Sequence, residues 1–275
     1  MEVKTRKIFG HLTVNLLSII HPIVNSTFSC PPRRNCNHSL QASAYYSFSL
    51  IHILAMDTLE CIKTRRSIRK FTTESVPRKD LEDLIETARW SPSYKNSQPW
   101  QAIILSGDKK KELSTMLVGL LGEGKENSPD LAAPTSWPEA EQKNITHLLA
   151  KRKELTGIDL GAPEMIVKAK KANFNFYYAP HAIYLFQDAS LSEWSLFDIG
   201  LFAQSLMLAA HAKGLATVPQ AFATDYAKEV KECLGISASK RLILGLSVGY
   251  PDMDSPINAY RTERAEVEEF CTWLE

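Results

Sequence analysis

The chain has 275 residues, of which 44% are apolar and 23% are charged, so it is long enough and apolar enough to bury a sizeable core. Its net charge of +1 excludes the strongly basic surface that binds nucleic acid or an acidic membrane, so we expect neither partner. The five cysteines are scattered and include no CxxC pair, which argues against a disulfide framework or a zinc site and favours a reducing, cytoplasmic location.

Residues 1–55 differ in composition from the rest of the chain. They hold one acidic residue, and their apolar stretch at 12–24 is interrupted by polar residues and is too short to span a bilayer. Cys30, Cys36 and His38 lack the spacing of a tetrahedral metal site. We expect a poorly structured N-terminal extension, either a targeting segment or sequence upstream of a start at Met56, followed by one domain at 56–275.

Two helices are predicted at the start of this domain. Asp57 and Glu60 have the spacing of a capping box, and Leu59 and Ile62 begin an apolar stripe. The second helix follows a proline and ends before Ser91-Pro92, and it repeats apolar residues at helical spacing: Leu81, Leu84, Ile85 and Ala88.

The later part of the chain alternates between strands and helices. In chain order we expect a buried strand at 100–105, a helix at 109–121, a loose excursion at 122–138, a helix at 143–155, a strand within 177–186, a helix at 194–212, a strand at 215–218, a helix at 225–234 closed by Gly235, and a strand at 242–248 ended by Gly249-Tyr250-Pro251. Two strands come late and close together, which favours a layered α+β fold over a doubly wound one.

The predicted helix at 194–212 is apolar on nearly every side. A helix of this kind is buried all round. We therefore expect it at the centre of the core or in a subunit interface.

A tight basic cluster, Arg65-Arg66-Ser67-Ile68-Arg69, follows the first helix. The arginine side chain presents its donors in a rigid fork that matches a phosphate, and like charges this close repel each other unless an anion neutralises them. On pattern alone, a solvated basic face explains the segment equally well.

The segment from Ser91 to Trp100 places small polar residues between two prolines. Asn96 and Gln98 each carry an amide donor and an amide acceptor, which suits a ring with alternating N–H and C=O groups, such as the pyrimidine edge of a flavin. A rigid loop whose amides bind its own backbone explains the segment as well.

The segment Gly214 to Phe222 runs from a short strand into Pro219-Gln220. Backbone N–H groups after the proline could point at a ligand and stabilise an electron-rich ring without a titrating side chain. The alternative is an ordinary strand end.

A second basic segment lies near the C-terminus, in Asn258 to Arg264. Arg261 or Arg264 could complete a phosphate site with the first cluster. Surface ion pairs with the glutamates at 266–269 are the competing explanation.

These four segments, in this order, resemble the nitroreductase superfamily of FMN enzymes over residues 56–273. The stretch 65–71 resembles the phosphate-binding signature of that family, and 91–100 resembles its second flavin motif. The Ala-Thr-Val-Pro-Gln run at 216–220, together with Gly249-Tyr250-Pro251-Asp252 and Arg261-Thr262-Glu263-Arg264, is most similar to the nitrobenzoate-reductase branch.

The resemblance implies a layered α+β fold with a mainly antiparallel sheet, and a homodimer that binds FMN at its interface. It also implies cofactor contacts from three groups of residues: Arg65, Arg66, Ser67, Arg69, Arg261 and Arg264 at the phosphate; Ser93, Asn96 and Gln98 at the ribityl chain and ring edge; and Pro219, Gln220 and Ala221 beside N5. Many relatives have Glu-Gly near Ala221-Phe222, which leaves the N5 donor open by one residue.

The activity implied is hydride transfer from NADH or NADPH to FMN, and then to a nitroaromatic or quinone-like acceptor in place of the nicotinamide. No side-chain acid or base is required. Residues 122–138 and 174–178 are the expected acceptor contacts. The competing functions are a flavin-dependent reductive dehalogenase and a flavin-binding protein without turnover.

Other motifs in the sequence do not support a different function. Gly245-Leu246-Ser247-Val248-Gly249 has the Gly-x-Ser-x-Gly pattern, but it lies within a predicted strand and is followed by Pro251 rather than a helix, so we expect no nucleophilic serine. No GxGxxG follows a strand, which argues against a Rossmann nucleotide site. His181 and His211 are expected to be structural residues rather than metal ligands.

Overall fold

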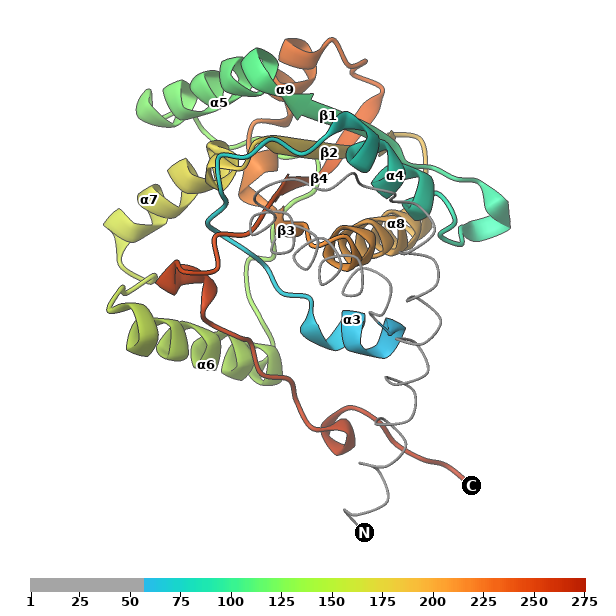
Figure 1. The fold of residues 1–275 in the computed structure, drawn as a ribbon, viewed down its shortest axis with the longest axis vertical. Coiled ribbons are helices and arrows are strands. Elements are labelled where there is room, and N and C mark those ends of the chain that lie inside the picture. Colours follow the sequence, from blue (N-terminus) through green and yellow to red (C-terminus); the bar gives the residue numbers. More distant parts are fainter. Residues whose placement is uncertain (1–56) are drawn as a thin grey trace, which may run out of the picture. The chain divides into compact units, whose positions relative to one another are not determined.

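A four-stranded antiparallel sheet is the centre of the computed structural model, which describes residues 57–275 (Figure 1). Its order is β1 (Gln101–Ser106), β2 (His181–Asp188), β4 (Lys240–Gly249) and β3 (Ala216–Gln220). The predicted α+β class and antiparallel sheet are confirmed. The predicted extension at 1–55, with Cys30, Cys36 and His38, lies outside the described residues.

Helices cover both faces of the sheet. They are α3 (Thr58–Thr64), α4 (Arg78–Ala88), α5 (Gly107–Gly122), α6 (Glu139–Thr156), α7 (Pro163–Phe174), α8 (Trp194–Ala212) and α9 (Ala227–Leu234), with short 3-10 turns η1 (Tyr94–Asn96), η2 (Phe176–Tyr178), η3 (Phe222–Thr224), η4 (Pro256–Asn258) and η5 (Val267–Glu269). Helix α7 was not predicted from the sequence.

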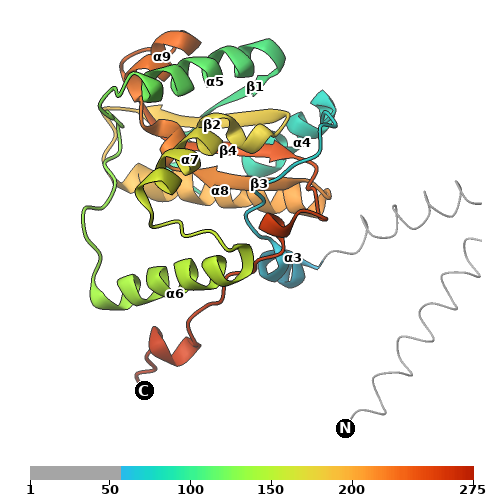
Figure 2. The same ribbon diagram turned by 90° about the vertical axis from the view of Figure 1, so that its left-hand side faces the viewer.

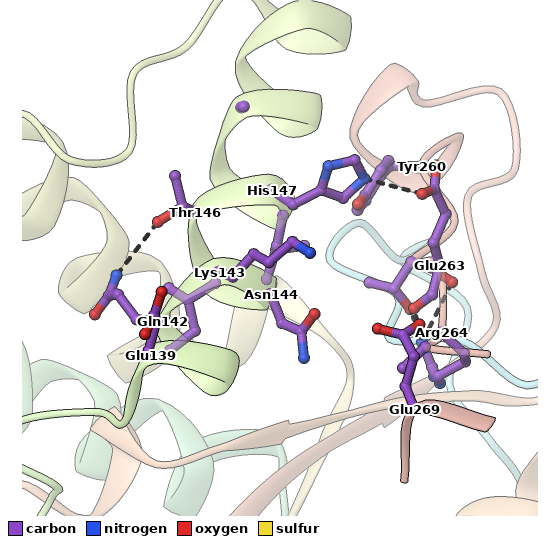
Figure 3. A pocket seen from close by; sticks show the side chains of 15 residues that line it. Glu139, Gln142, Lys143, Asn144, Thr146, His147, Tyr260, Glu263, Arg264 and Glu269 are labelled. Carbon is purple, nitrogen blue, oxygen red and sulfur yellow. Dashed lines mark hydrogen bonds and ion pairs between the residues drawn. The ribbon is translucent and has the colours of Figure 1, made fainter. Parts of the chain in front are cut away.

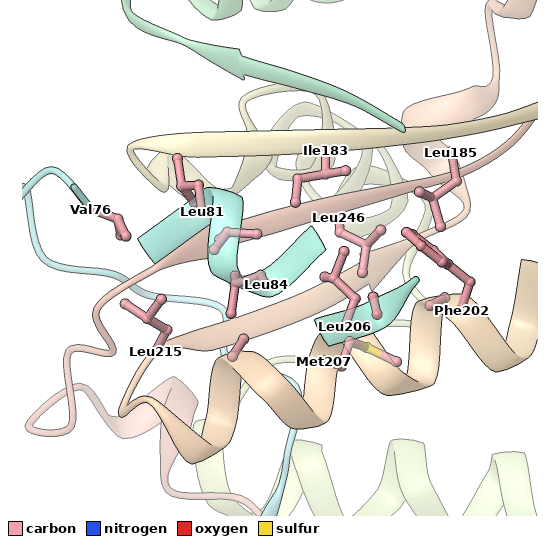
Figure 4. Close-up of a cluster of buried hydrophobic side chains, with 14 of the residues drawn as sticks. Val76, Leu81, Leu84, Ile183, Leu185, Phe202, Leu206, Met207, Leu215 and Leu246 are labelled. Atoms are coloured by element: carbon pink, nitrogen blue, oxygen red, sulfur yellow. The ribbon is translucent and has the colours of Figure 1, made fainter. Parts of the chain in front are cut away.

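Alternation along β2 divides the core into two layers. Ile183 and Leu185 face α4 and α8, in a cluster that includes Phe202 and Leu206 (Figure 4). Ala182, Tyr184 and Phe186 face the opposite layer, which contains buried residues of α5, α7 and α9. Figure 2 shows α8 along one side of the sheet and α5 and α9 along the other. Burial of each large apolar side chain contributes about 1.5–3 kcal/mol, so this alternation sets the register of β2.

The outer strand β1 is less buried than predicted. It lies at the edge of the sheet and pairs only with β2, and Leu105 is its one fully buried residue. An apolar run on an edge strand packs against a helix on one face while its outer edge stays open.

The first helix also differs from the prediction. Asp57 is its N-cap, but its side chain makes no cap hydrogen bond, so the capping box with Glu60 is not formed. Leu59 and Ile62 are exposed, whereas Cys61 is buried and its thiol contacts the backbone oxygen of Leu208 in α8. A helix of seven residues has one narrow buried side, and contact with α8 decides which side that is.

Helix α8 is not buried on all sides within one chain. Ile199, Phe202 and Leu206 are buried against α4 and the sheet, but Trp194 and Phe197 are 67% and 69% exposed. The helix is long and apolar enough to cross a membrane by composition alone, yet one side of it forms part of the core. The exposed apolar residues, including Leu201, follow helical spacing and form a stripe on the opposite side.

The excursion at 122–138 is tied to the body of the domain at its middle. The backbone N–H of Ser128 donates to the Asp225 oxygen at 2.7 Å. The Asp130 carboxylate accepts hydrogen bonds from Lys231 Nζ at 2.8 and 2.9 Å and from the Leu242 N–H at 2.7 Å. After this anchor the chain continues into α6, in which no residue is buried.

Candidate functional site

The basic segment after α3 is held by the open edge of β3. The Ile68 N–H donates to the Thr217 oxygen at 3.1 Å, and Ser67 forms a parallel bridge with the same residue. Ile68 and Phe71 are buried. These two apolar anchors fix the backbone next to Arg65 and Arg66, the two arginines before Ile68 that line a cavity.

Arg65 is the most constrained of these arginines. Its Nη1 is buried and has no hydrogen-bond partner among the described residues. Burial lowers the pKa of its guanidinium, and the nearby charge of Arg264 lowers that pKa further. Buried polar groups are nearly always hydrogen-bonded, so an orphaned guanidinium nitrogen indicates a site for an anionic ligand.

A cavity of about 300 Å³ lies beside this group. It is lined by Thr64, Arg65, Arg66, Ile68, His211, Gly214, Leu215, Ala216, Thr217, Pro251, Met253 and Arg261. Thr64 Oγ1 and His211 Nε2 are 2.8 Å apart. Burial lowers the pKa of His211, and the charges of Arg65, Arg261 and Arg66 lower it further, which favours the neutral imidazole.

Four of the predicted phosphate-binding arginines therefore converge: Arg65, Arg66, Arg261 and Arg264. Burial lowers the pKa of Arg66, and the charge of Arg261 lowers it further. Within residues 57–275 no ion pair joins any of the four to a carboxylate, so the competing explanation, ion pairs with the glutamates at 266–269, is not supported. Arg264 Nη1 is instead bound locally, to Thr262 Oγ1 at 2.6 Å.

Arg69 is not among the residues that line the 300 Å³ cavity. Its backbone N–H donates to Asn258 Oδ1 at 2.8 Å, and its Nη1 reaches the Ser67 oxygen at 3.4 Å. Burial lowers the pKa of Arg152 in α6, and the charge of Arg69 lowers it further. Arg69 thus lies toward α6.

The loop at 91–98 has an unusual backbone. Lys95, Asn96 and Gln98 have φ of 51°, 57° and 47°, a left-handed conformation that is uncommon outside glycine and that recurs at functional sites. The loop is anchored by the Tyr94 N–H, which donates to Asp198 at 3.1 Å, and by the Gln98 N–H, which donates to Ser93 Oγ at 3.0 Å. The amide side chains of Asn96 and Gln98 remain exposed.

The loop and the arginines lie near opposite ends of α8. The loop is tied to Asp198 near the start of the helix, whereas His211 at its end lies among the arginines. These two residues are about 20 Å apart along the axis, at a rise of about 1.5 Å per residue. One chain therefore does not bring the predicted amide loop and the predicted phosphate site together.

The third predicted segment ends strand β3. Gln220 is buried, and both polar groups of its side chain are hydrogen-bonded within the protein. Its Nε2 donates to the Asn173 backbone oxygen at 2.9 Å, and its Oε1 accepts from Ser247 Oγ at 2.6 Å. Only the backbone of Gln220 is left for a ligand, as it is for Pro219. Ala221 is exposed at the strand end.

The residues set aside in the sequence are structural. Ser247 is buried in β4, and its hydroxyl donates within the protein. His181 Nε2 accepts a hydrogen bond from the Val76 N–H at 3.0 Å. Of the expected acceptor contacts at 174–178, Phe174 and Phe176 are fully buried, so that part of the prediction is wrong.

A second, larger cavity of about 1100 Å³ lies between α6 and the segment 260–269 (Figure 3). His147 Nε2 and Glu263 Oε2 are 2.9 Å apart across it. Arg264 and Tyr260 line the side opposite α6.

A profile described as the nitroreductase family matches residues 62–250. The chain belongs to the nitroreductase family. The 4-nitrobenzoate reductase of Pseudomonas putida is 30% identical to it over 230 residues, which cover 81% of this chain and 97% of that protein.

Solved nitroreductases share the fold of this family member. The FMN- and NADPH-dependent nitroreductase NfnB of Sphigopyxis sp. strain HMH has a TM-score of 0.76 at 25% identity, covering 80% of this chain and 100% of that one. The FMN-dependent nitroreductase NfnB of Mycobacterium smegmatis, in complex with NADPH, has a TM-score of 0.74 at 29% identity, covering 78% and 96%. The predicted nitroreductase-like fold is confirmed.

Two residues of this nitroreductase domain have surroundings that the sequence did not indicate. His211 was set aside as structural, and its place among the arginines follows from the turn that joins α8 to β3. Arg152 lies in the run Lys-Arg-Lys at 151–153, which reads as an exposed helix surface. No local signal separates Arg152 from its neighbours.

Proposed function

We propose that residues 56–275 form an FMN-binding domain that transfers hydride from NADH or NADPH, through the flavin, to a nitroaromatic or quinone-like acceptor. The observation that carries the proposal is the orphaned guanidinium of Arg65 within a group of four arginines, in a chain of the nitroreductase family. Relatives named for FMN, NADPH and 4-nitrobenzoate support the cofactors and the class of acceptor.

The residues present fit a flavin phosphate. Arg65, Arg66, Arg261 and Arg264 would hold it, since a dianion neutralises their repulsion and supplies the partner that Arg65 Nη1 lacks. The backbone from Pro219 to Ala221 would lie beside the ring. Bound FMN supplies the redox chemistry, while the chain binds it, orients it and excludes water.

We further propose that the active unit is a homodimer. The exposed stripe of Trp194, Phe197 and Leu201 is an apolar surface of the kind that a second copy covers. Two α8 helices packed antiparallel about a two-fold axis would bring the start of one helix to the end of the other. The loop with Ser93, Asn96 and Gln98 would then reach the partner's phosphate site, which one chain does not achieve alone.

The location we propose is the cytoplasm. The described cysteines, Cys61, Cys233 and Cys271, are free thiols, which suits a reducing compartment.

The test is reduction of the purified protein without oxygen. We expect a yellow protein whose flavin absorbance is bleached by NADH or NADPH and restored by 4-nitrobenzoate or a quinone. A colourless protein that cannot be loaded with FMN would contradict the proposal. A yellow protein that neither nicotinamide reduces would favour storage of flavin, and selective turnover of an iodinated phenol would favour the dehalogenase.

A further inference from the structure

His211 differs from the other charged or titrating residues that line the 300 Å³ cavity, because the others are arginines. It lies in the last turn of α8. An arginine stays protonated at every accessible pH, whereas an imidazole gains or loses its charge near neutral pH. Among the described residues of this cavity, His211 is therefore the one whose charge can respond to a ligand.

The hydrogen bonds of Thr64 fix the tautomer of His211. The Thr64 hydroxyl donates its one proton to the Glu60 backbone oxygen at 2.6 Å, so towards the imidazole it can only accept. Thr64 Oγ1 lies 2.8 Å from His211 Nε2, so Nε2 carries a proton and donates it. A neutral imidazole has a proton on one ring nitrogen only. Nδ1 of His211 therefore holds a lone pair.

This Nδ1 is the ring nitrogen that a ligand can reach. Within residues 57–275 it makes no hydrogen bond, and it is not one of the polar atoms sealed in the core. The imidazole lines the cavity, as does the guanidinium segment at Arg65. A lone pair on Nδ1 cannot bind a phosphate oxygen, because both are acceptors. A proton on Nδ1 would make it a charged donor.

Three arginines disfavour this proton in the free protein. Arg65 and Arg66 line the cavity from the segment after α3, and Arg261 lines it from the C-terminal segment. Burial lowers the pKa of His211, and these three charges lower it further. No carboxylate lines the cavity in the part of the chain that the structure describes.

The other titrating groups near the end of α8 are engaged elsewhere. Asp80 and Asp83 of α4 both pair with Lys213, at 2.8 and 2.9 Å. The Cys61 thiol on α3 contacts the Leu208 backbone oxygen at 3.5 Å, and burial raises the pKa of that thiol, which keeps it neutral. Among the described residues the imidazole thus has no anionic partner, and an entering anion would be its first.

We propose that His211 takes up a proton from solution at Nδ1 when the FMN phosphate enters this cavity, and that Nδ1 then donates a hydrogen bond to the phosphate. The dianion offsets the repulsion from the three arginines, so the charged imidazole is favourable only in the complex. FMN binding is then coupled to proton uptake. The inference rests on the proposed function and deepens it, because it adds a residue to the phosphate site and makes that site respond to pH.

The direction of the pH dependence follows from the two states of His211. Its pKa is lowered in the free protein and is raised again by the bound dianion. Between these two values, binding takes up a proton, so the affinity for FMN increases as the pH decreases through the pKa of the complex. The FMN phosphate itself loses charge near about pH 6, which acts in the opposite direction. A variant without the imidazole shows that second effect alone.

The experiment measures FMN binding to the apoprotein by quenching of flavin fluorescence, between about pH 6.5 and about pH 8.5, on either side of which the imidazole changes charge. We expect His211→Gln to raise the Kd of FMN by about 10- to 100-fold at the lower pH, the scale of a charged hydrogen bond. At the higher pH the two proteins should have nearly equal Kd values. Riboflavin, which lacks the phosphate, should bind both proteins equally at every pH.

Proton uptake is measured directly by calorimetry of FMN binding at neutral pH, in buffers of different ionisation enthalpy. The wild type should take up more protons than His211→Gln. Thr64→Val removes the acceptor that holds the proton on Nε2, so a neutral His211 can donate from Nδ1, and the pH dependence should diminish. His147→Gln removes an imidazole that lies outside the 300 Å³ cavity and should behave as the wild type.

Two results would overturn the inference. One is a loss of FMN affinity in His211→Gln that is the same at every pH, with no difference in proton uptake. The other is equal weakening of FMN and riboflavin, which would assign His211 a structural role. An apoprotein that binds no FMN contradicts the proposed function instead. Titration of the wild-type imidazole by NMR, with and without inorganic phosphate, then still decides, because an unchanged pKa in saturating phosphate contradicts this inference.

Discussion

Single residues indicate where a bound anion would be stabilising. Arg65 holds a buried nitrogen without a partner, and its pKa is lowered first by burial and then by Arg264. Both effects disfavour the charged guanidinium in the free protein, and a bound anion would offset them by supplying an opposite charge and a hydrogen-bond partner. Exposed arginines such as Arg78, which pairs with Glu82 at 2.8 Å, have no such requirement. Arg65 and Arg78 therefore differ in their position in the fold, not in residue type.

Replacing Arg65 by methionine tests the phosphate site. We expect Arg65→Met to weaken FMN binding by about 1.5–3 kcal/mol, the value of a hydrogen bond to a charged group, measured by quenching of flavin fluorescence. Arg78→Met, which removes an exposed charge on α4, should leave the affinity unchanged. Equal affinities for Arg65→Met and wild type would exclude Arg65 from the phosphate site.

His211 makes the stability of the apoprotein depend on pH. Its pKa is lowered in the folded state, by burial first and then by three arginines, so the unfolded chain binds more protons below about pH 6.5. The free energy of unfolding should therefore fall as the pH decreases through that value. Urea unfolding of His211→Gln should show a smaller loss. Part of the loss should remain, because burial also lowers the pKa of His181. An unchanged profile in the variant would contradict this account.

Helix α8 connects the core to the proposed interface. One side carries Phe202 and Leu206 into the core, and the other exposes Trp194 and Phe197. The same helix also positions both predicted parts of the cofactor site, the loop through Asp198 and the arginines through His211. Because these contacts lie near opposite ends, the helix sets the spacing at which a second copy would complete the proposed site.

A charge in the exposed stripe should separate the subunits. We expect Phe197→Glu to give a monomer in sedimentation experiments and to bind FMN more weakly, because a buried unpaired carboxylate is strongly unfavourable in an apolar interface. Ile166→Glu, on the exposed side of α7, is the matched control and should change neither property. A Phe197→Glu dimer with normal FMN content would place the interface elsewhere.

Over the whole domain, long-range ties hold the excursion at 122–138 to the core. Asp130 joins the excursion at 122–138 to α9 through Lys231 and to β4 through the Leu242 N–H. Helix α6, with no buried residue, begins shortly after this tie and carries Arg152. The domain thus combines a packed core with a lightly held helix beside its larger cavity.

Removal of the Asp130 carboxylate should cost stability. In Asp130→Ala the Lys231 ammonium and the Leu242 N–H lose their partner, and we expect a loss of about 1–3 kcal/mol in the free energy of unfolding. Faster amide exchange in 122–138 should accompany it. Glu154→Ala breaks only an exposed pair and should have little effect. Equal stabilities for the two variants would show that Asp130 is not an anchor.

Local pattern was sufficient for most elements of this protein. Helix α4 follows the spacing of Leu81, Leu84 and Ala88, and α9 ends at Gly235, whose φ of 65° suits glycine. The predicted α+β class, the strands and the excursion at 122–138 follow from the same short-range signals. The arginines near each end of the domain were predicted to bind phosphate because their residue type has a strong preference for it, and this stays a prediction.

Tertiary structure alone decided what those residues meet. Contacts between distant segments decide which side of α3 and of α8 is buried, and they make β1 an edge strand. They also place Asn173 and Ser247 where they bind the side chain of Gln220. Arg152 shows the difference clearly, because it is a surface-like residue by sequence but is half-buried in the folded chain. Sequence determines each residue's chemistry and local conformation, whereas burial and neighbouring charge arise only when the chain closes on itself.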